Sequence, residues 1–168
     1  MSNDNVPDPR GSGSLISDII KKPTEEMEDY FIFENDPQIS AKWGKKYDSK
    51  YAGKWMMFYP FSTLDEKWEE AIKNYRSGKL IGIDSMKVST KKKNPRASDD
   101  STGVIIFYCG PANDEKLVMS YGHNLLKYVP YINAYGFMYY KSDMQTLQGT
   151  RATGQKSNSK YKIPVPRK

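Results

Sequence analysis

The stretch from residue 55 to residue 78 constrains the fold most, because a short apolar run is followed directly by an amphipathic helix. WMMFYP, residues 55–60, is continuously apolar and aromatic, which is typical of a buried strand. In residues 62–78, Thr63 and Glu66 have the spacing of a capping box, and Gly78 provides a stop. The apolar residues that follow a helical period are Leu64, Trp68, Ala71, Ile72 and Tyr75. The pattern predicts a strand and a helix that pack on each other, with Trp68 in the core.

Further strands and helices are expected on both sides of this unit. Residues 83–90, 102–110 and 137–141 have the composition of strands, and residues 144–150 form another possible one. Residues 15–22 allow one or two helical turns, and residues 23–36 begin like a helix, with a proline ahead of a run of acids. A second long helix is expected over 114–129 after an Asn113 cap, with its inner face formed by Leu117, Val118, Tyr121, Leu125 and Tyr128. This order predicts an α+β fold, in which helices cover one face of an antiparallel sheet.

The length and composition predict one domain with two irregular ends. A chain of 168 residues that is 38% hydrophobic can bury one core. We expect a disordered leader over 1–14, a single domain over 15–155, and a basic tail over 156–168 in which Pro164 and Pro166 discourage regular structure. The sequence has neither a membrane-length apolar run nor a signal peptide, which predicts a cytoplasmic protein, with the nucleus as the alternative. One Cys and one His predict no disulfide, no metal site and no cofactor.

The net charge of +6 is unevenly distributed along the chain. Residues 1–40 carry three basic and nine acidic side chains, whereas residues 149–168 carry six basic and no acidic ones. An excess of basic side chains in the body and the tail favours a polyanionic partner such as a nucleotide, RNA or another phosphorylated ligand. The alternative is an ordinary solvated surface with an acidic arm.

Several segments resemble the Bles family, the basophilic leukaemia-expressed proteins. They are GKWMMFYPFSTLDEKWEEAIKNYRSGKL at 53–80, MKVST at 86–90, GVIIFYCG at 103–110 and YYKSDMQT at 139–146. The resemblance covers roughly residues 40–150. It implies the fold of the cap-binding translation initiation factor 4E, a curved antiparallel sheet with helices on its convex back.

The resemblance also implies what a cap site would need. In cap-binding proteins two tryptophans sandwich a methylated guanine, an acid reads the edge of the base, and Arg and Lys hold the phosphates. In this chain Trp43 or Trp55 offers one ring, but no tryptophan follows Trp68. A tyrosine or phenylalanine would have to supply the second face, since any aromatic ring can stack on a base.

Three basic stretches form the predicted binding site. The first is Lys87 with Ser89, which point to the same face of a strand, and the second is the loop 91–96 that contains Arg96. The third joins Lys141 to the glycine-bounded loop GTRATGQ, with Thr150, Arg151, Thr153 and Gln155. An Arg side chain can donate two hydrogen bonds to one phosphate, and hydroxyl groups supply further hydrogen-bond donors. Glycines let backbone amides approach an anion closely. The alternatives are an exposed hairpin tip and a flexible loop.

The function expected from these features is binding of a phosphorylated ligand, a nucleotide or RNA, by stacking and by Lys and Arg on the concave face. The strip 43–55, which interleaves basic and aromatic residues, fits this function, although such rings also anchor cores. One alternative is an enzyme for a phosphorylated or phosphodiester nucleotide, with proton transfer from Lys87, Lys141, Arg151 or the tyrosines Tyr108, Tyr139 and Tyr140. Another is a protein-interaction module. His123 is expected on a helix surface and Cys109 in the core, so neither is a candidate nucleophile or base.

Overall fold

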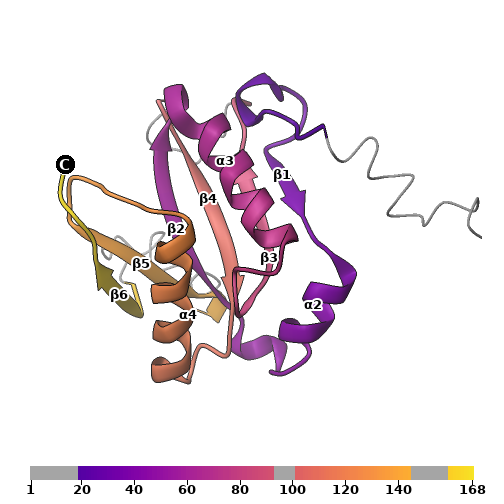
Figure 1. Ribbon diagram of the computed structural model, residues 1–168, viewed down its shortest axis with the longest axis vertical. Coiled ribbons are helices and arrows are strands. Elements are labelled where there is room, and N and C mark those ends of the chain that lie inside the picture. The colour runs from indigo at the N-terminus through magenta and orange to yellow at the C-terminus, as the bar shows by residue number, and fades with distance from the viewer. Residues whose placement is uncertain (1–18, 93–100, 145–158) are drawn as a thin grey trace, which may run out of the picture.

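A sheet of six antiparallel strands forms the centre of the fold (Figure 1). The computed structural model describes residues 19–92, 101–144 and 159–168. The strands are β1 (Phe31–Glu34), β2 (Gly53–Pro60), β3 (Ile83–Ser89), β4 (Thr102–Cys109), β5 (Phe137–Ser142) and β6 (Tyr161–Pro164). They lie in the order β1-β3-β4-β2-β5-β6, and every neighbouring pair is antiparallel. The predicted α+β class with an antiparallel sheet is therefore confirmed.

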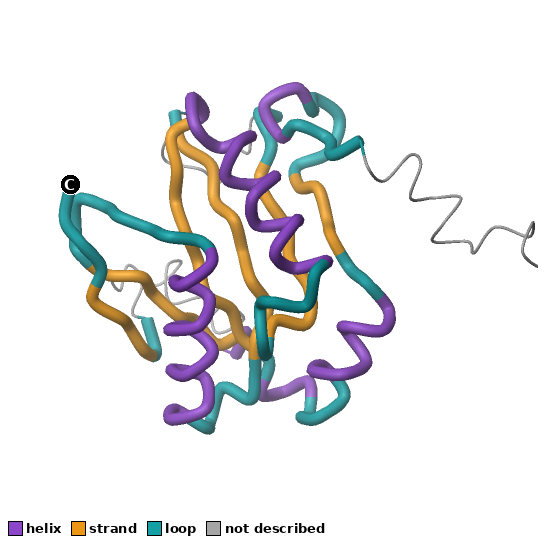
Figure 2. Tube along the Cα trace, in the orientation of Figure 1, coloured by secondary structure: helices purple, strands orange, loops and turns teal. Residues whose placement is uncertain are grey.

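Two long helices cover the same face of this sheet (Figure 2). Helix α3 (Phe61–Arg76) contacts β2 and β4, and helix α4 (Glu115–Tyr128) contacts β6. A shorter helix, α2 (Pro37–Gly44), packs on β3, and two single 3₁₀ turns are η2 (Pro23–Glu25) and η3 (Ser49–Tyr51). None of the helices in the described part of the chain combines the length and apolar character needed to cross a membrane.

The core lies between the sheet and the helices. Strand β2 alternates strictly, so that Trp55 and Met57 are fully buried against the helices while their neighbours face the other way. The predicted inner face of α3 is confirmed, because Leu64, Trp68, Ala71, Ile72 and Tyr75 are all buried. Each large apolar side chain that is fully buried stabilises the fold by about 1.5–3 kcal/mol. Local periodicity thus specified this part of the core.

Helix α4 approaches the sheet closely at a glycine. A Cβ atom on Gly122 would lie 2.6 Å from both Trp55 and Ile163, so that only glycine leaves room for these two side chains.

Asp114, rather than Asn113, caps helix α4, and its side chain accepts the N–H of Leu117 at 3.1 Å. Leu117 therefore sits in the first turn at the edge of the interface and is 36% exposed, which corrects its predicted place on the inner face. Cys109 is buried and His123 is exposed, as predicted.

Helix α3 begins earlier than the capping-box spacing suggested. Its first residue is Phe61 and its N-cap is Pro60, whose side chain offers no hydrogen bond. Thr63 lies inside the first turn, where its hydroxyl donates to the Pro60 carbonyl at 3.3 Å. The chain ends the helix as predicted, with Gly78 at a positive φ of 78°.

The segment 23–36 is not a helix, contrary to the sequence prediction. It contains η2 and then strand β1, which pairs with β3 in the register Phe31↔Ser89 and Phe33↔Lys87. Alternating aromatic residues favour a strand, and the pairing with β3 outweighs the weak local helix signal. The helix starts later, where the Asp36 carboxylate accepts the N–H groups of Gln38 and Ile39 and Pro37 occupies the first turn.

The basic tail is also more ordered than expected. Residues Tyr161–Pro164 form β6, which pairs with β5 at the edge of the sheet. Ile163 is 1% exposed, and the Tyr161 ring stacks on Tyr140 at a centroid distance of 5.6 Å. An edge strand tolerates proline, so Pro164 does not prevent pairing. The leader 1–14, the loop residues 93–100 and residues 145–150 of the expected strand lie outside the described residues.

Candidate ligand-binding face

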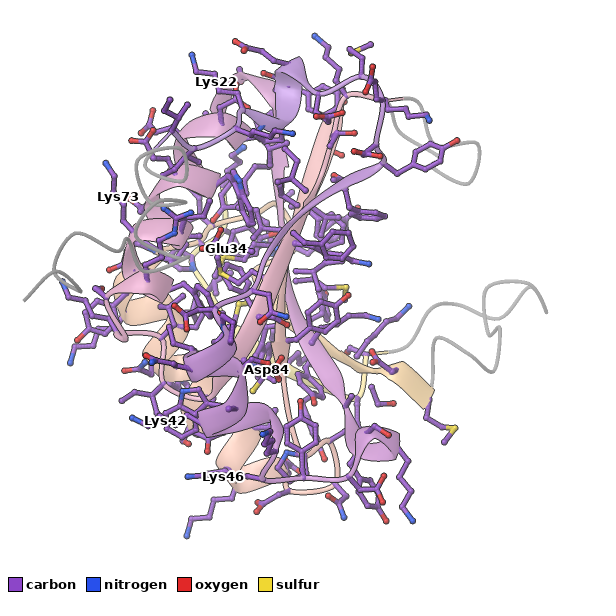
Figure 3. All side chains as sticks on the ribbon, turned by 90° about the vertical axis from the view of Figure 1, so that its right-hand side faces the viewer. Lys22, Glu34, Lys42, Lys46, Lys73 and Asp84 are labelled. Atoms are coloured by element: carbon purple, nitrogen blue, oxygen red, sulfur yellow. The ribbon has the colours of Figure 1, made fainter. Side chains whose placement is uncertain are left out.

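The sheet face that turns away from α3 and α4 carries rings and lysines. We call it the concave face, and in Figure 3 it lies on the side opposite the helices, where a ladder of side chains projects from the strands. Its residues alternate with the buried positions of each strand. They are Phe31 and Phe33 in β1, Lys87 and Ser89 in β3, Ile106 and Tyr108 in β4, Lys54, Met56 and Phe58 in β2, Phe137, Tyr139 and Lys141 in β5, and Lys162 in β6.

At one end of this face the Lys87 ammonium group lies among three aromatic rings. Its Nζ is 4.1 Å from the ring centroid of Phe31, 5.6 Å from that of Phe33 and 5.8 Å from that of Tyr108. Ring faces attract a cation at these distances. Burial lowers the pKa of Lys87, and Phe33 remains 66% exposed. A charged group and an open ring face are therefore within reach of one ligand.

The other end of the concave face repeats this combination. The Lys162 Nζ lies 4.4 Å from the ring centroid of Phe137, whose own centroid is 6.2 Å from that of Tyr139. A groove of about 920 Å³ borders these strands and reaches α4. Its lining includes Met56, Phe58, Tyr139, Lys141 and Lys162, together with Glu115 and Met119 of α4. Its volume lies in the range of small-molecule and cofactor sites.

Lysines from two neighbouring strands connect the ends. Lys54 of β2 pairs in register with Lys141 of β5 and with Tyr108 of β4. The Lys54 ammonium group forms an ion pair with Asp143, with 3.1 Å between Nζ and Oδ1. The carboxylate of Asp143 therefore offsets part of the positive charge at this point.

The structure brings together five of the residues that the sequence singled out. Lys87, Ser89, Tyr108, Tyr139 and Lys141 all belong to the concave face, and alternation along the strand predicted that Lys87 and Ser89 share a face. The Ser89 hydroxyl already accepts the N–H of Val104 at 2.8 Å, so it also holds β3 to β4. The remaining candidates, Arg96, Thr150, Arg151, Thr153 and Gln155, lie outside the described residues.

The tryptophans do not face this surface, which corrects the sequence interpretation. Trp55 is fully buried under α4, where its Nε1 donates to the Val118 carbonyl at 3.3 Å, so its ring cannot stack on a ligand. The Trp43 ring packs edge-on against Tyr121 of α4, at a centroid distance of 5.9 Å. Lys42 and Lys46, which lie over the Trp43 ring, are labelled on the helix side in Figure 3. Trp68, the third tryptophan of the chain, is also fully buried.

Sequence reasoning missed the exposed phenylalanines. Phe31 and Phe33 alternate within FIFE, which is a strand signal, but the acids before them favoured a helix. Phe58 is 48% exposed, and a continuous apolar run gives no sign of which residues face outward. Lys162 was assigned to an irregular tail, so its place beside Phe137 could not be anticipated.

Burial disfavours the charged forms of several polar side chains in the described part of the chain. Burial raises the pKa of the Cys109 thiol, which suppresses the thiolate form. Burial also raises the pKa of Tyr108. Asp84 lines a second cavity of about 450 Å³ beside α2 and η3, where Tyr47 and Ser85 donate to its carboxylate at 2.7 and 2.9 Å. These hydrogen bonds satisfy the carboxylate within the fold.

The similarity of the chain to solved structures concerns its fold. No protein-family model and no curated protein matches the chain. Among solved structures, the chain is similar to eIF4E-3 of C. elegans, which was solved in complex with the 4E-binding protein Mextli. The similarity has a TM-score of 0.58 at 10% identity, and it covers 90% of this chain and 80% of the other. The chain therefore has a 4E-like fold, as the resemblance of its segments implied, while membership of the Bles family stays a prediction.

Proposed function

We propose that this chain binds a phosphorylated ligand, a nucleotide or RNA, on its concave face without covalent chemistry. The observation that carries the proposal is the Lys87 ammonium group held among the rings of Phe31, Phe33 and Tyr108. Stacking on a ring and a charge on a phosphate are the two contacts that nucleotide binding combines. The 4E-like fold and the net charge of +6 support the same function.

The mode of stacking would differ from that of cap-binding proteins. The resemblance implies a sandwich of two tryptophans, but none of the three tryptophans of this chain lies on the concave face. Phe33 and Phe58, which are 66% and 48% exposed, are the rings that a base can reach. We therefore propose stacking on phenylalanine, with Arg96 and Arg151 as further phosphate ligands.

Replacement of Lys87 tests this proposal. In titration calorimetry with ATP and with hexauridylate RNA, Lys87→Ala is expected to weaken binding at least five-fold, because a charge-assisted contact to phosphate is lost. Lys73→Ala is the matched control, because Lys73 is an exposed lysine of α3 on the helix side (Figure 3). A wild-type protein that binds neither probe would overturn the proposal.

The same samples distinguish binding from catalysis. The enzyme alternative draws on the lowered pKa of Lys87, which is the direction that a general base needs, whereas the raised pKa of Tyr108 opposes proton abstraction by that residue. Mass spectrometry of the recovered probes is expected to show them unchanged. A new mass that disappears in Lys87→Ala would establish an enzyme instead.

A further inference from the structure

The strand registers place six residues in one row that crosses the whole concave face. Each residue is directly opposite the next one in the neighbouring strand, and such partners in antiparallel pairs point to the same face. In sheet order the row is Phe33, Lys87, Ile106, Met56, Tyr139 and Lys162. We call it the transverse row. It runs at right angles to the strands, from one edge of the sheet to the other.

The transverse row has the same chemistry at both ends and an apolar centre. Phe33 and Lys87 form one end, and Tyr139 and Lys162 form the other. Between them lie Ile106 and Met56. A second row beside it contains Tyr108, Lys54 and Lys141 in the same sheet order. Rings and ammonium groups therefore recur across the face instead of gathering around one pocket.

The length of the row sets the size of the ligand. Five steps between strands of about 4.8 Å each span about 24 Å. Fully stacked nucleotides rise by about 3.4 Å each along one strand, so at most about seven of them span the row, and fewer are needed where bases separate to stack on the rings. A mononucleotide can contact only one end.

We propose that the ligand is a single-stranded oligonucleotide that lies across the strands along the transverse row. This inference rests on the proposed function and specifies its ligand. A single strand is required because the faces of its bases are open to rings, whereas a duplex stacks them on one another. Charge complementarity favours it, because Lys87, Lys141 and Lys162 mark the path, while the charge of Lys54 is paired with the Asp143 carboxylate. The row offers ring faces and charges, so binding is expected to depend little on sequence.

Oligouridylates of one to ten nucleotides test the inference by fluorescence anisotropy. We expect the affinity to rise at least ten-fold between two and seven nucleotides and to change little from eight to ten. Phe33→Ala and Lys162→Ala each remove one contact, at opposite ends of the row. Each should lower the affinity for the octanucleotide at least three-fold. The dinucleotide reaches one end of the row only, so its affinity should fall with at most one of these substitutions. Phe33→Tyr and Lys162→Arg should retain octamer binding, and thermal melting checks that each variant is folded.

Four results would overturn the inference. The third would also remove stacking from the proposed function, and the fourth would overturn that function entirely. One is a mononucleotide or dinucleotide that binds as tightly as the octanucleotide. Another is an octanucleotide whose affinity falls with only one of the Phe33→Ala and Lys162→Ala substitutions. Either result would indicate a compact nucleotide site in place of the row. Inorganic polyphosphate that competes equally in wild type and in Phe33→Ala would show a general anion surface without stacking. A wild-type protein that binds no uridylate of any length and no ATP would overturn both proposals.

Discussion

At the scale of single residues, Asp84 shows how the fold holds a carboxylate out of water. Its side chain is 8% exposed and accepts hydrogen bonds from Tyr47 and Ser85. Burial raises the pKa of Asp84, and the two hydrogen bonds reduce this shift without cancelling it. The folded protein therefore keeps the proton of Asp84 to a higher pH than the unfolded chain does.

Because of this pKa shift, ionisation of Asp84 should lower the free energy of unfolding, and the size of this effect should depend on pH. The free energy of unfolding of the wild type relative to Asp84→Asn should fall as the pH rises from about 4, the ordinary pKa of aspartate, to 7. The sign follows because a raised pKa in the folded state makes the charged form destabilising. Urea unfolding at pH 4, 5.5 and 7 measures the difference.

Glu26 provides a control of opposite sign. Its carboxylate accepts the N–H groups of Glu28 and Asp29 at 3.0 Å, and these hydrogen bonds lower the pKa of Glu26. The wild type relative to Glu26→Gln should therefore gain stability as the pH rises through the same range. If the Asp84→Asn difference is flat or rises with pH, the carboxylate is not held in a desolvated position.

At the scale of elements, the two edge strands mark the limit of what the sequence could predict. Strand β2 and helix α3 were predictable, because the apolar pattern of residues 55–78 is local and strong. Strands β1 and β6 have four residues each and lie at opposite edges of the sheet, where pairing with β3 and β5 defines them. Such pairing is non-local, so the sequence of one short segment gives little indication that the segment forms a strand.

The candidate site likewise contains residues that local patterns could place and residues that depend on non-local strand pairing. Alternation within strands predicted that Lys87 and Ser89 share a face, and the pairing of the central strands adds Tyr108 and Lys141. The role given to Trp55 was wrong because a continuous apolar run does not reveal which residues face the helices. Phe33 and Lys162 were missed because both belong to edge strands, and no local pattern placed them on one face.

Strand β6 is expected to contribute to stability through Ile163. This side chain is 1% exposed and packs on Gly122 of α4. Ile163→Ala should lower the free energy of unfolding by about 2–5 kcal/mol, because it removes buried apolar atoms and leaves a cavity. Lys162→Ala, one residue earlier on the opposite face, should cost about 1 kcal/mol or less, since it loses only an exposed contact with Phe137. Equal effects in denaturant unfolding would contradict the role of β6 as part of the core.

At the scale of the whole molecule, the fold separates stabilising packing from the proposed binding. The large buried side chains lie between the sheet and its helices, and the transverse row lies on the other face. Variants of the concave face can therefore test binding without removing the core. The acidic N-terminal region and the basic body belong to one chain with a net charge of +6, so binding should respond strongly to salt.

The salt dependence of oligonucleotide binding measures how many lysines meet phosphates. A single strand releases counterions such that the logarithm of the affinity falls with the logarithm of the salt concentration, with a slope of about −0.7 per phosphate contact. Three or four contacts from the lysines of the concave face would give a slope of about −2 to −3 for the octamer. Lys87→Ala should make the slope less negative by about 0.7, and Lys73→Ala should leave it unchanged. Anisotropy at 50, 100 and 200 mM salt gives these slopes, and an unchanged slope in Lys87→Ala would show that this ammonium group stays with its rings and does not meet a phosphate.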